Sequence, residues 1–317
     1  MLVCSELDSA LQLLKSAGFR LDAIFPADAP HTAMLSLGES VVRLTTLPDA
    51  PSVPDELPAF EPAFVLSSTD DPGGEGRAGM RYRDLIPGRL GGRYVASHIR
   101  ITEGGPVADW VHYHRVAFQM IFVRSGWVRV VYEDQGEPFV MAAGDLVLQP
   151  PGIRHRVLES SPGLEVIEIG CPAIHETLTD HDLELPNASV APDRLFGGQR
   201  FIRHVADDAG WSEFHGAEIQ ATAMLDATGG LADVRVLRPG RSPSIDFPPH
   251  DGELVFGFVL EGSATLDFEG EHPLMAGSAF VIPPERDWTL DGPSADFRFL
   301  HVTTAKLGQN VLATNIR

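Results

Sequence analysis

Two histidines separated by one residue, His112 and His114, constrain this chain more strongly than any other feature of its 317 residues. The β-branched and aromatic residues around them favour an extended strand, and side chains two apart on a strand project from the same face. Both imidazoles can therefore reach one metal ion, whereas a helix would splay them apart. Gln119 follows in the next apolar run, and His155 ends the segment 144–155. The pattern predicts a metal site.

The spacing of these residues resembles the first motif of the cupin superfamily, which runs Gly, His-x-His, Glu and Gly. Gly105 precedes His112 by one residue more than usual, and Gly126 ends the motif in its expected place. Gln119 stands where cupins usually carry glutamate. The resemblance implies that His112, His114 and Gln119 are metal ligands.

The second cupin motif is also present. It requires a glycine, a Pro-x-Gly turn and a histidine, and the chain has Gly144, Pro150, Gly152 and His155 at the matching positions. Glu159 replaces the asparagine that usually ends this motif. The resemblance implies His155 as a further ligand of one divalent ion. Imidazole and amide ligands suit Fe, Ni, Zn, Mn and Co, so the pattern does not select among these metals.

An internal repeat indicates a second barrel. Residues 277–284 echo residues 144–151, with a glycine at the start, an apolar run and a Pro-Pro pair at the end. Two such barrels in one chain resemble a bicupin. The expected fold is therefore mainly β, with two cupin jelly-roll barrels in tandem and a small α/β module at the N-terminus.

The second barrel has lost most of the ligand pattern. When its motif is aligned with the first, His250 falls opposite His114. The remaining motif positions carry Pro248, Val255, Glu285 and Trp288. A single imidazole holds a divalent ion poorly, so we expect the second barrel to be empty.

The expected domain boundaries follow composition. Residues 1–47 form the small module, residues 48–80 a Pro/Gly-rich linker, residues 81–186 the metal-binding barrel, and residues 187–317 the degenerate barrel. The run from Asp180 to Asp182 carries ligand-type side chains, but it follows the first barrel and is interpreted as a solvated connector.

The N-terminal module is predicted to contain a helix over residues 5–18, capped by Ser5 and Asp8 and ended by Gly18. Strands are predicted over residues 33–37 and 41–45. This arrangement resembles half a module of the glyoxalase, or vicinal-oxygen-chelate, fold. His31 and Glu39 are its most evident ligand-type residues, but we favour a docking or dimerisation element without metal.

Charge and composition exclude several classes of partner. The net charge of -20 opposes binding to nucleic acid or to anionic membranes. No segment resembles a signal peptide or a membrane span, which predicts a cytoplasmic protein. Cys4 and Cys171 form no metal or redox motif and are expected to be free thiols.

The ligand set suggests the chemistry. Three imidazoles and an amide leave the charge of a divalent ion uncompensated, which favours a small anionic substrate that chelates the ion. The leading hypothesis is a dioxygenase that acts on a diketone or an aromatic diol, as known cupin dioxygenases do. A non-redox isomerase or lyase of a sugar acid or keto acid is the main alternative, and a non-catalytic metabolite-binding bicupin is the third.

Five further side chains are candidates for acid, base or orienting roles: His98, Arg100, Tyr113, Trp127 and Glu168. Alternation along the strand directs Arg154 and Arg156 away from the metal, so they are expected to form surface ion pairs. The resemblance also implies a homodimer through edge strands, although two barrels in one chain could meet that need internally.

Overall fold

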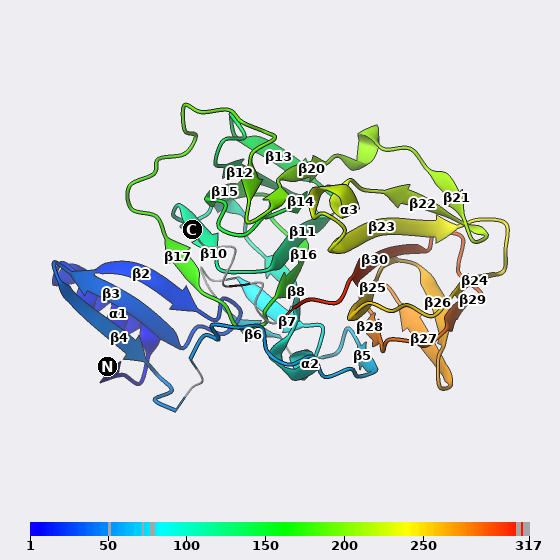
Figure 1. Ribbon diagram of the computed structural model, residues 1–317, viewed down its shortest axis with the longest axis horizontal. Coiled ribbons are helices and arrows are strands. Elements are labelled where there is room, and N and C mark those ends of the chain that lie inside the picture. Colours follow the sequence, from blue (N-terminus) through cyan, green and yellow to red (C-terminus); the bar gives the residue numbers. More distant parts are fainter. Residues whose placement is uncertain (50–51, 72, 77–79, 309–311, 313–317) are drawn as a thin grey trace.

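The computed structural model describes residues 1–49, 52–71, 73–76, 80–308 and 312 of the chain. Figure 1 shows three parts in a row: the N-terminal strands and helix in blue at the left, a first barrel in the middle, and a second barrel in yellow and orange at the right. The fold is mainly β, as the sequence predicts. None of the helices in the described residues is long and apolar enough to cross a membrane.

The first barrel is built from two sheets. One sheet has the spatial order β1 (Leu2–Val3), β4 (Ser40–Thr45), β3 (Thr32–Leu37), β2 (Arg20–Phe25), β17 (Thr177–Thr179), β10 (His112–His114), β15 (His155–Ser160), β12 (Trp127–Tyr132) and β13 (Phe139–Ala142), with β9 (Gly105–Pro106) paired to β15. The opposite sheet has the order β20 (Ile202–His204), β14 (Leu146–Leu148), β11 (Phe118–Ser125), β16 (Leu164–Cys171), β8 (Val95–Ile101), β7 (Arg81–Asp84) and β6 (Gly74–Glu75).

The second barrel repeats this plan. Its larger sheet has the order β21 (Ser212–Phe214), β22 (Ala217–Ala221), β23 (Ala232–Pro239), β30 (Arg298–Thr304), β25 (Leu254–Glu261), β28 (Ala279–Ile282) and β5 (Val65–Ser67). The smaller sheet contains β24 (Ser244–Phe247), β29 (Trp288–Asp291), β26 (Ser263–Asp267) and β27 (Glu271–Met275). The remaining elements are the hairpin β18 (Leu195–Phe196) and β19 (Gln199–Arg200), the helices α1 (Leu7–Ser16), α2 (Arg89–Gly92) and α3 (Met224–Ala227), and the 3₁₀ helix η2 (Ala206–Asp208).

The N-terminal unit continues the sheet of the first barrel. Strand β2 pairs antiparallel with β17, so that Ile24 lies opposite Thr177 and Ala23 opposite Leu178. Strand β17 in turn pairs with β10, which carries the His-x-His pair. A single strand therefore separates the N-terminal unit from the predicted metal ligands.

Helix α1 is shorter than the predicted range of residues 5–18, because it runs from Leu7 to Ser16. The predicted cap is wrong: Glu6 occupies the N-cap position, and Ser9 donates a hydrogen bond to its carboxylate. The predicted end is confirmed, since Gly18 adopts a φ of +94° and Phe19 N–H donates to Leu14 O across 3.0 Å. Strands β3 and β4 each begin one residue before their predicted ranges.

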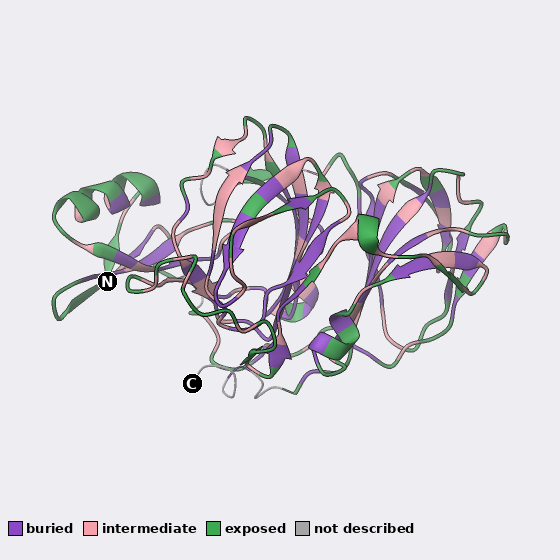
Figure 2. Cartoon of the chain, turned by 90° about the horizontal axis from the view of Figure 1, so that it is seen from above, coloured by how far each residue is buried: buried purple, intermediate pink, exposed green. Residues whose placement is uncertain are grey.

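A buried apolar core joins the two barrels. Ile167 and Ile169 of β16 belong to the same core as Phe256 and Phe258 of β25 and Val302 of β30. In Figure 2 the buried residues follow the strands of both barrels, whereas the helix at the N-terminal end is largely exposed. The sheet of the first barrel that contains β16 therefore faces the larger sheet of the second barrel across this core.

Strands are exchanged across the expected domain boundaries. Within the segment expected as a linker, Leu57 is buried in the core between the barrels, and β5 pairs with β28 of the second barrel. Conversely, β20 lies in the segment assigned to the second barrel but pairs with β14 of the first. Described parts of the segment that was expected as a linker are therefore buried or paired in a sheet, although the segment is rich in proline and glycine.

Candidate metal centre

Three buried histidines converge inside the first barrel. In the antiparallel pair β10–β15, His112 lies opposite His155, and His114 lies two residues further along β10 on the same face. One ligand nitrogen from each of the three histidines lies within 4.8 Å of the others. Among the described residues, this is the single group of three or more His, Cys, Asp or Glu side chains with such a spacing.

Backbone carbonyls orient two of the rings. His112 Nδ1 lies 2.8 Å from Trp110 O, and His155 Nδ1 lies 3.1 Å from Ile153 O. A carbonyl only accepts, so each Nδ1 carries the proton and each Nε2 keeps its lone pair. Such a contact at the far nitrogen is the usual support of a metal-binding histidine.

Backbone hydrogen bonds also tie the two motifs together. Gly152 N–H donates to His114 O across 3.2 Å, and Gln149 N–H donates to Gln119 O across 2.9 Å. Gly152 has a φ of +77°, a conformation that favours glycine. The turn before His155 is thus held against the strands that carry the other predicted ligands.

Gln119 is buried on β11 and lines the same cavity as the histidines. Its Nε2 donates to Glu168 Oε1 across 2.6 Å. Its Oε1 is buried and accepts no hydrogen bond from any residue in the described part of the chain. A buried oxygen without a donor is costly, and amide oxygen is a metal ligand, so these residues fit a divalent ion.

Glu168 reaches the cavity from a neighbouring strand. In the β11–β16 pairing, Gln119 lies opposite Gly170 and Ile121 opposite Glu168, which makes Gln119 and Glu168 diagonal neighbours on one face. Of the five candidates for acid, base or orienting roles, only Glu168 lines the cavity. Its carboxylate brings negative charge close to the position where the motif has lost a glutamate.

The cavity is small and mostly apolar, with a volume of about 100 Å³. Its polar lining consists of the three histidines, Gln119, Gln149, Glu168, Tyr82 and Tyr132. Its apolar lining consists of Ala27, Met80, Ile99, Ile101, Ile121, Val128, Val130, Met141, Val157, Leu164 and Val166. The described lining contains no lysine or arginine.

The sequence did not single out Tyr132 and Gln149 as site residues. The Tyr132 ring stacks on His155 with a centroid separation of 5.4 Å, and Gln149 Nε2 donates to Tyr132 Oη across 3.1 Å. Burial raises the pKa of Tyr132, so its phenol stays protonated. The position of Gln149 within the second motif, next to Pro150, was the available signal.

His98 and Arg100 lie on the opposite face of β8 from the cavity, which Ile99 and Ile101 line instead. His98 Nε2 lies 2.9 Å from Glu165 Oε2, and its ring contacts Phe258 of the second barrel. Burial lowers the pKa of His98, so the neutral ring donates to the carboxylate. Both residues belong to an ion-pair cluster around Glu165.

Tyr113 and Trp127 also lie outside the described cavity lining. Tyr113 alternates with the two histidines of β10, and the Arg154 guanidinium lies 4.2 Å from its ring centroid. Arg154 thus points away from the metal centre, as the strand alternation predicts.

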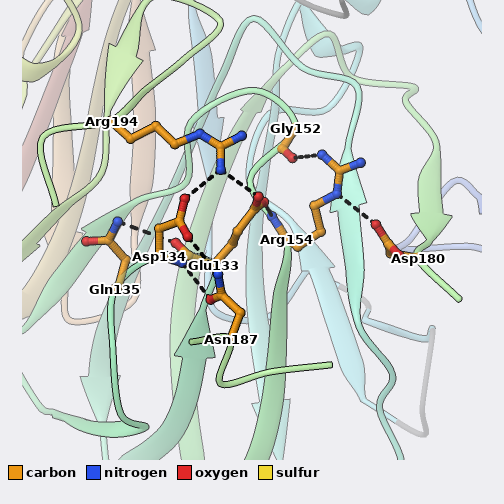
Figure 3. A network of polar contacts seen from close by, with 8 residues as sticks. All are labelled: Glu133, Asp134, Gln135, Gly152, Arg154, Asp180, Asn187 and Arg194. Carbon is orange, nitrogen blue, oxygen red and sulfur yellow. Dashed lines mark hydrogen bonds and ion pairs between the residues drawn. The ribbon is translucent and has the colours of Figure 1, made fainter. Parts of the chain in front are cut away.

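Figure 3 shows the polar network that Arg154 joins. Arg154 Nε donates to Asp180 Oδ2 across 3.0 Å, while Arg194 contacts both Glu133 and Asp134. Asp180 also accepts hydrogen bonds from the backbone of residues 182 and 183. His181 and Asp182 are exposed, as expected of a solvated connector, whereas Asp180 is partly buried and anchors the turn before His155 to the chain that leaves β17.

The second barrel is packed with aromatic side chains. Phe247 and Trp288 stack at a centroid separation of 3.8 Å, and Phe280 and Phe299 pack beside them. His301 pairs with Gly257 where Glu168 pairs with Ile121 in the first barrel, and burial lowers the pKa of His301 to about 3. Phe247, Phe280, Trp288 and Phe299 belong to one buried apolar core inside the second barrel.

The other ligand-type residues do not converge. Within the described residues, His250 belongs to no group of three potential ligands, and neither do His31 and Glu39. His31 Nδ1 instead lies 2.9 Å from Thr32 Oγ1. A metal-free second barrel and a metal-free N-terminal module stay predictions.

Comparisons with known proteins agree with this architecture. Residues 98–169 match the cupin domain family. No curated protein sequence matches the chain. Nothing among these comparisons identifies the N-terminal unit with the glyoxalase family, so that resemblance stays a prediction.

Several solved structures share the fold at low identity. The Ylba protein from E. coli is 14% identical, with a TM-score of 0.57 over 78% of this chain and 93% of that one. A putative glyoxylate-induced protein from Pseudomonas aeruginosa is 13% identical, with a TM-score of 0.57 over 81% and 94%. A variant of oxalate decarboxylase from Bacillus subtilis is 12% identical, with a TM-score of 0.56 over 80% of each chain.

Proposed function

Residues 98–169 are a cupin domain within a chain that has the fold of a bicupin, and from this premise we propose that the protein is a metal-dependent dioxygenase acting on a small chelating substrate. The substrate class is a diketone or an aromatic diol. One divalent ion would be held by His112, His114 and His155, with Gln119 as the fourth ligand. The observation that carries the proposal is the orphaned Gln119 oxygen beside three histidines in an apolar cavity.

A bound ion would act as a Lewis acid toward two substrate oxygens and, if it is iron, would supply the redox chemistry of dioxygen. The protein's own contribution begins with ring orientation. The carbonyls of Trp110 and Ile153 keep the protons of His112 and His155 on Nδ1, so both Nε2 atoms face the ligand position. The site is therefore oriented by the backbone before any substrate enters.

The lining of the cavity favours a substrate with an apolar body. Sugar acids carry several hydroxyls, each of which needs a hydrogen-bond partner once it is buried. The described lining offers few such partners and no cationic side chain. A diketone enolate or a diol places its polar oxygens at the ion and its carbon skeleton against residues such as Ile99 and Val128, which supports the proposed class.

Glu168 is the residue we assign to proton transfer. Its carboxylate lines the cavity, and the hydrogen bond from Gln119 holds it next to the ligand set. A diketone or diol loses a proton when it chelates a cation, and in this proposal Glu168 accepts that proton. The same carboxylate supports a second candidate, a non-redox isomerase of a keto compound, because proton transfer beside a polarised carbonyl is all that this reaction needs.

The test is to purify the protein without oxygen and without added metal, and then to measure its metal content by elemental mass spectrometry. Oxygen uptake is next measured with pentane-2,4-dione and with catechol, using His112→Ala as the metal-free control and Glu168→Gln as the proton-transfer variant. Near-stoichiometric iron with substrate-dependent uptake that is lost in both variants supports the dioxygenase. Zinc or nickel without uptake would favour the isomerase, and ligand binding without turnover would leave a binding protein.

A further inference from the structure

One residue from outside the barrel lines the metal cavity. All other described lining residues fall between Met80 and Glu168, but Ala27 comes from the loop between β2 and β3 of the N-terminal unit. The pairing of β2 with β17 places this loop there, because β17 lies directly beside the histidine strand β10. The cavity is therefore incomplete without the N-terminal unit.

The loop that carries Ala27 is held in place at several points. His31 N–H donates to Phe25 O across 3.3 Å, which closes the loop at its base. Asp28 forms an ion pair with Arg89, and Arg89 Nε also lies 3.2 Å from Asp84 Oδ2 at the end of β7. The ion pairs tie the loop to the barrel.

Backbone packing at Gly76 reinforces this contact. A Cβ atom at Gly76 would lie 2.9 Å from Asp28 O and 2.5 Å from carbons of the Tyr82 ring, so only glycine allows this approach. Tyr82 itself lines the cavity. The loop of residues 26–30 therefore packs against the segment at Gly76 and Tyr82, which borders the cavity.

We propose that the N-terminal unit caps the metal cavity and that Ala27 determines which substrates fit. Ala27 is partly buried, and its small methyl side chain leaves about 100 Å³ for the substrate. A cavity of roughly 150 Å³ is known to hold benzene, so this one accepts at most a single small ring or a short chain. The inference rests on the proposed metal site and narrows its substrates to small molecules with a short apolar end.

The test uses ligands that bind an open metal position whatever the natural substrate is. The full-length protein is loaded with Co²⁺, and binding of imidazole and of 4-phenylimidazole is followed by the visible absorption of the ion. The variant Ala27→Phe fills the cavity. The matched control is Ala29→Phe, which makes the same change two residues away on the same loop, at an exposed position outside the cavity lining.

We expect wild type to bind imidazole more tightly than 4-phenylimidazole, and Ala27→Phe to weaken imidazole at least tenfold while keeping one cobalt per chain. Ala29→Phe should match wild type within twofold. If Ala27→Phe fails to fold or to load cobalt, Ala27→Val provides the same test, with an expected weakening of at least threefold.

Two negative results can be told apart. The cap would be overturned if Ala27→Phe, like Ala29→Phe, bound imidazole as tightly as wild type does. The same holds if Ala27→Val, used as the replacement, bound imidazole as tightly as wild type. Either result would leave the proposed function intact. Failure of wild type to bind cobalt through its histidines would overturn the metal site, and this inference with it.

Discussion

Gln119 donates a hydrogen bond from Nε2 to Glu168 Oε1 across 2.6 Å, and this contact determines how the amide is oriented. An ionised carboxylate only accepts, so the NH₂ group faces Glu168 and the amide oxygen is left for another partner. The usual cupin carboxylate is thus replaced by two residues, a neutral amide at the ligand position and a carboxylate beside it.

Removal of a histidine should empty the site. His112→Ala or His155→Ala takes one imidazole from a small ligand set. Loss of a contact that only supports a ligand lowers metal affinity ~10–100-fold, and loss of the ligand itself should lower it further. Elemental analysis of the purified variants measures this directly. Metal content equal to wild type in either variant would contradict the ligand assignment.

His250→Ala should leave the metal stoichiometry unchanged at one ion per chain. His250 belongs to no group of three potential ligands among the described residues, and aromatic side chains fill the interior around Trp288. The measurement is again metal per chain, made on samples prepared in parallel with wild type. A stoichiometry that falls by half would reveal an occupied second barrel.

Gln119→Glu should keep the metal and weaken an anionic ligand. The new carboxylate would face Glu168 and add a negative charge next to the ion, which opposes an enolate. Binding of pentane-2,4-dione by calorimetry measures the effect. The double variant Gln119→Glu/Glu168→Gln restores the net charge and should recover most of the affinity, whereas tighter diketone binding by the single variant would refute the charge argument.

Glu253→Gln should destabilise the whole chain. The Glu253 carboxylate accepts from Arg93 Nε and Nη2 across 2.8 and 2.7 Å, and both side chains are buried between the barrels. An uncompensated buried charge costs about 3–5 kcal/mol of unfolding free energy. Urea unfolding should show this loss.

The control for Glu253 is the same change at an exposed pair. Glu269 lies 2.8 Å from Arg286, and both side chains are about half exposed. Glu269→Gln should cost about 0–1 kcal/mol. Equal effects of the two substitutions would show that the buried pair does not hold the barrels together.

Glu165 should make stability depend on pH in the acid range. The hydrogen bond from His98, with Arg124 and Arg100 nearby, lowers the pKa of Glu165 to about 2. A carboxyl with a lowered folded-state pKa stabilises the fold above its unfolded pKa of about 4.3, and this stabilisation is lost as pH falls toward 2. The melting temperature of Glu165→Gln should therefore lie well below wild type at pH 7 and approach it at low pH. A difference between the two proteins that stays constant down to pH 2.5 would contradict this linkage.

Much of the metal centre is predictable from the sequence because its determinants are local. The alternation of His112 and His114 on a strand, and the turn before His155, depend on residues within a few positions of each other. The repeat at residues 277–284 likewise predicts the second barrel, since the repeated glycine, apolar run and Pro-Pro pair are local features of the sequence. These predictions need no knowledge of how distant segments meet.

The tertiary structure alone decides which distant side chains share the cavity. Glu168 lines the cavity, whereas His98 and Arg100 lie on the opposite face of their strand. A shift of one residue in strand register would exchange these faces, so the sequence alone does not fix them. Ala27 reaches it only because β2 pairs with β17, a contact between segments about 150 residues apart. Such pairings depend on the free energy of the whole sheet, so no short pattern in the sequence predicts them.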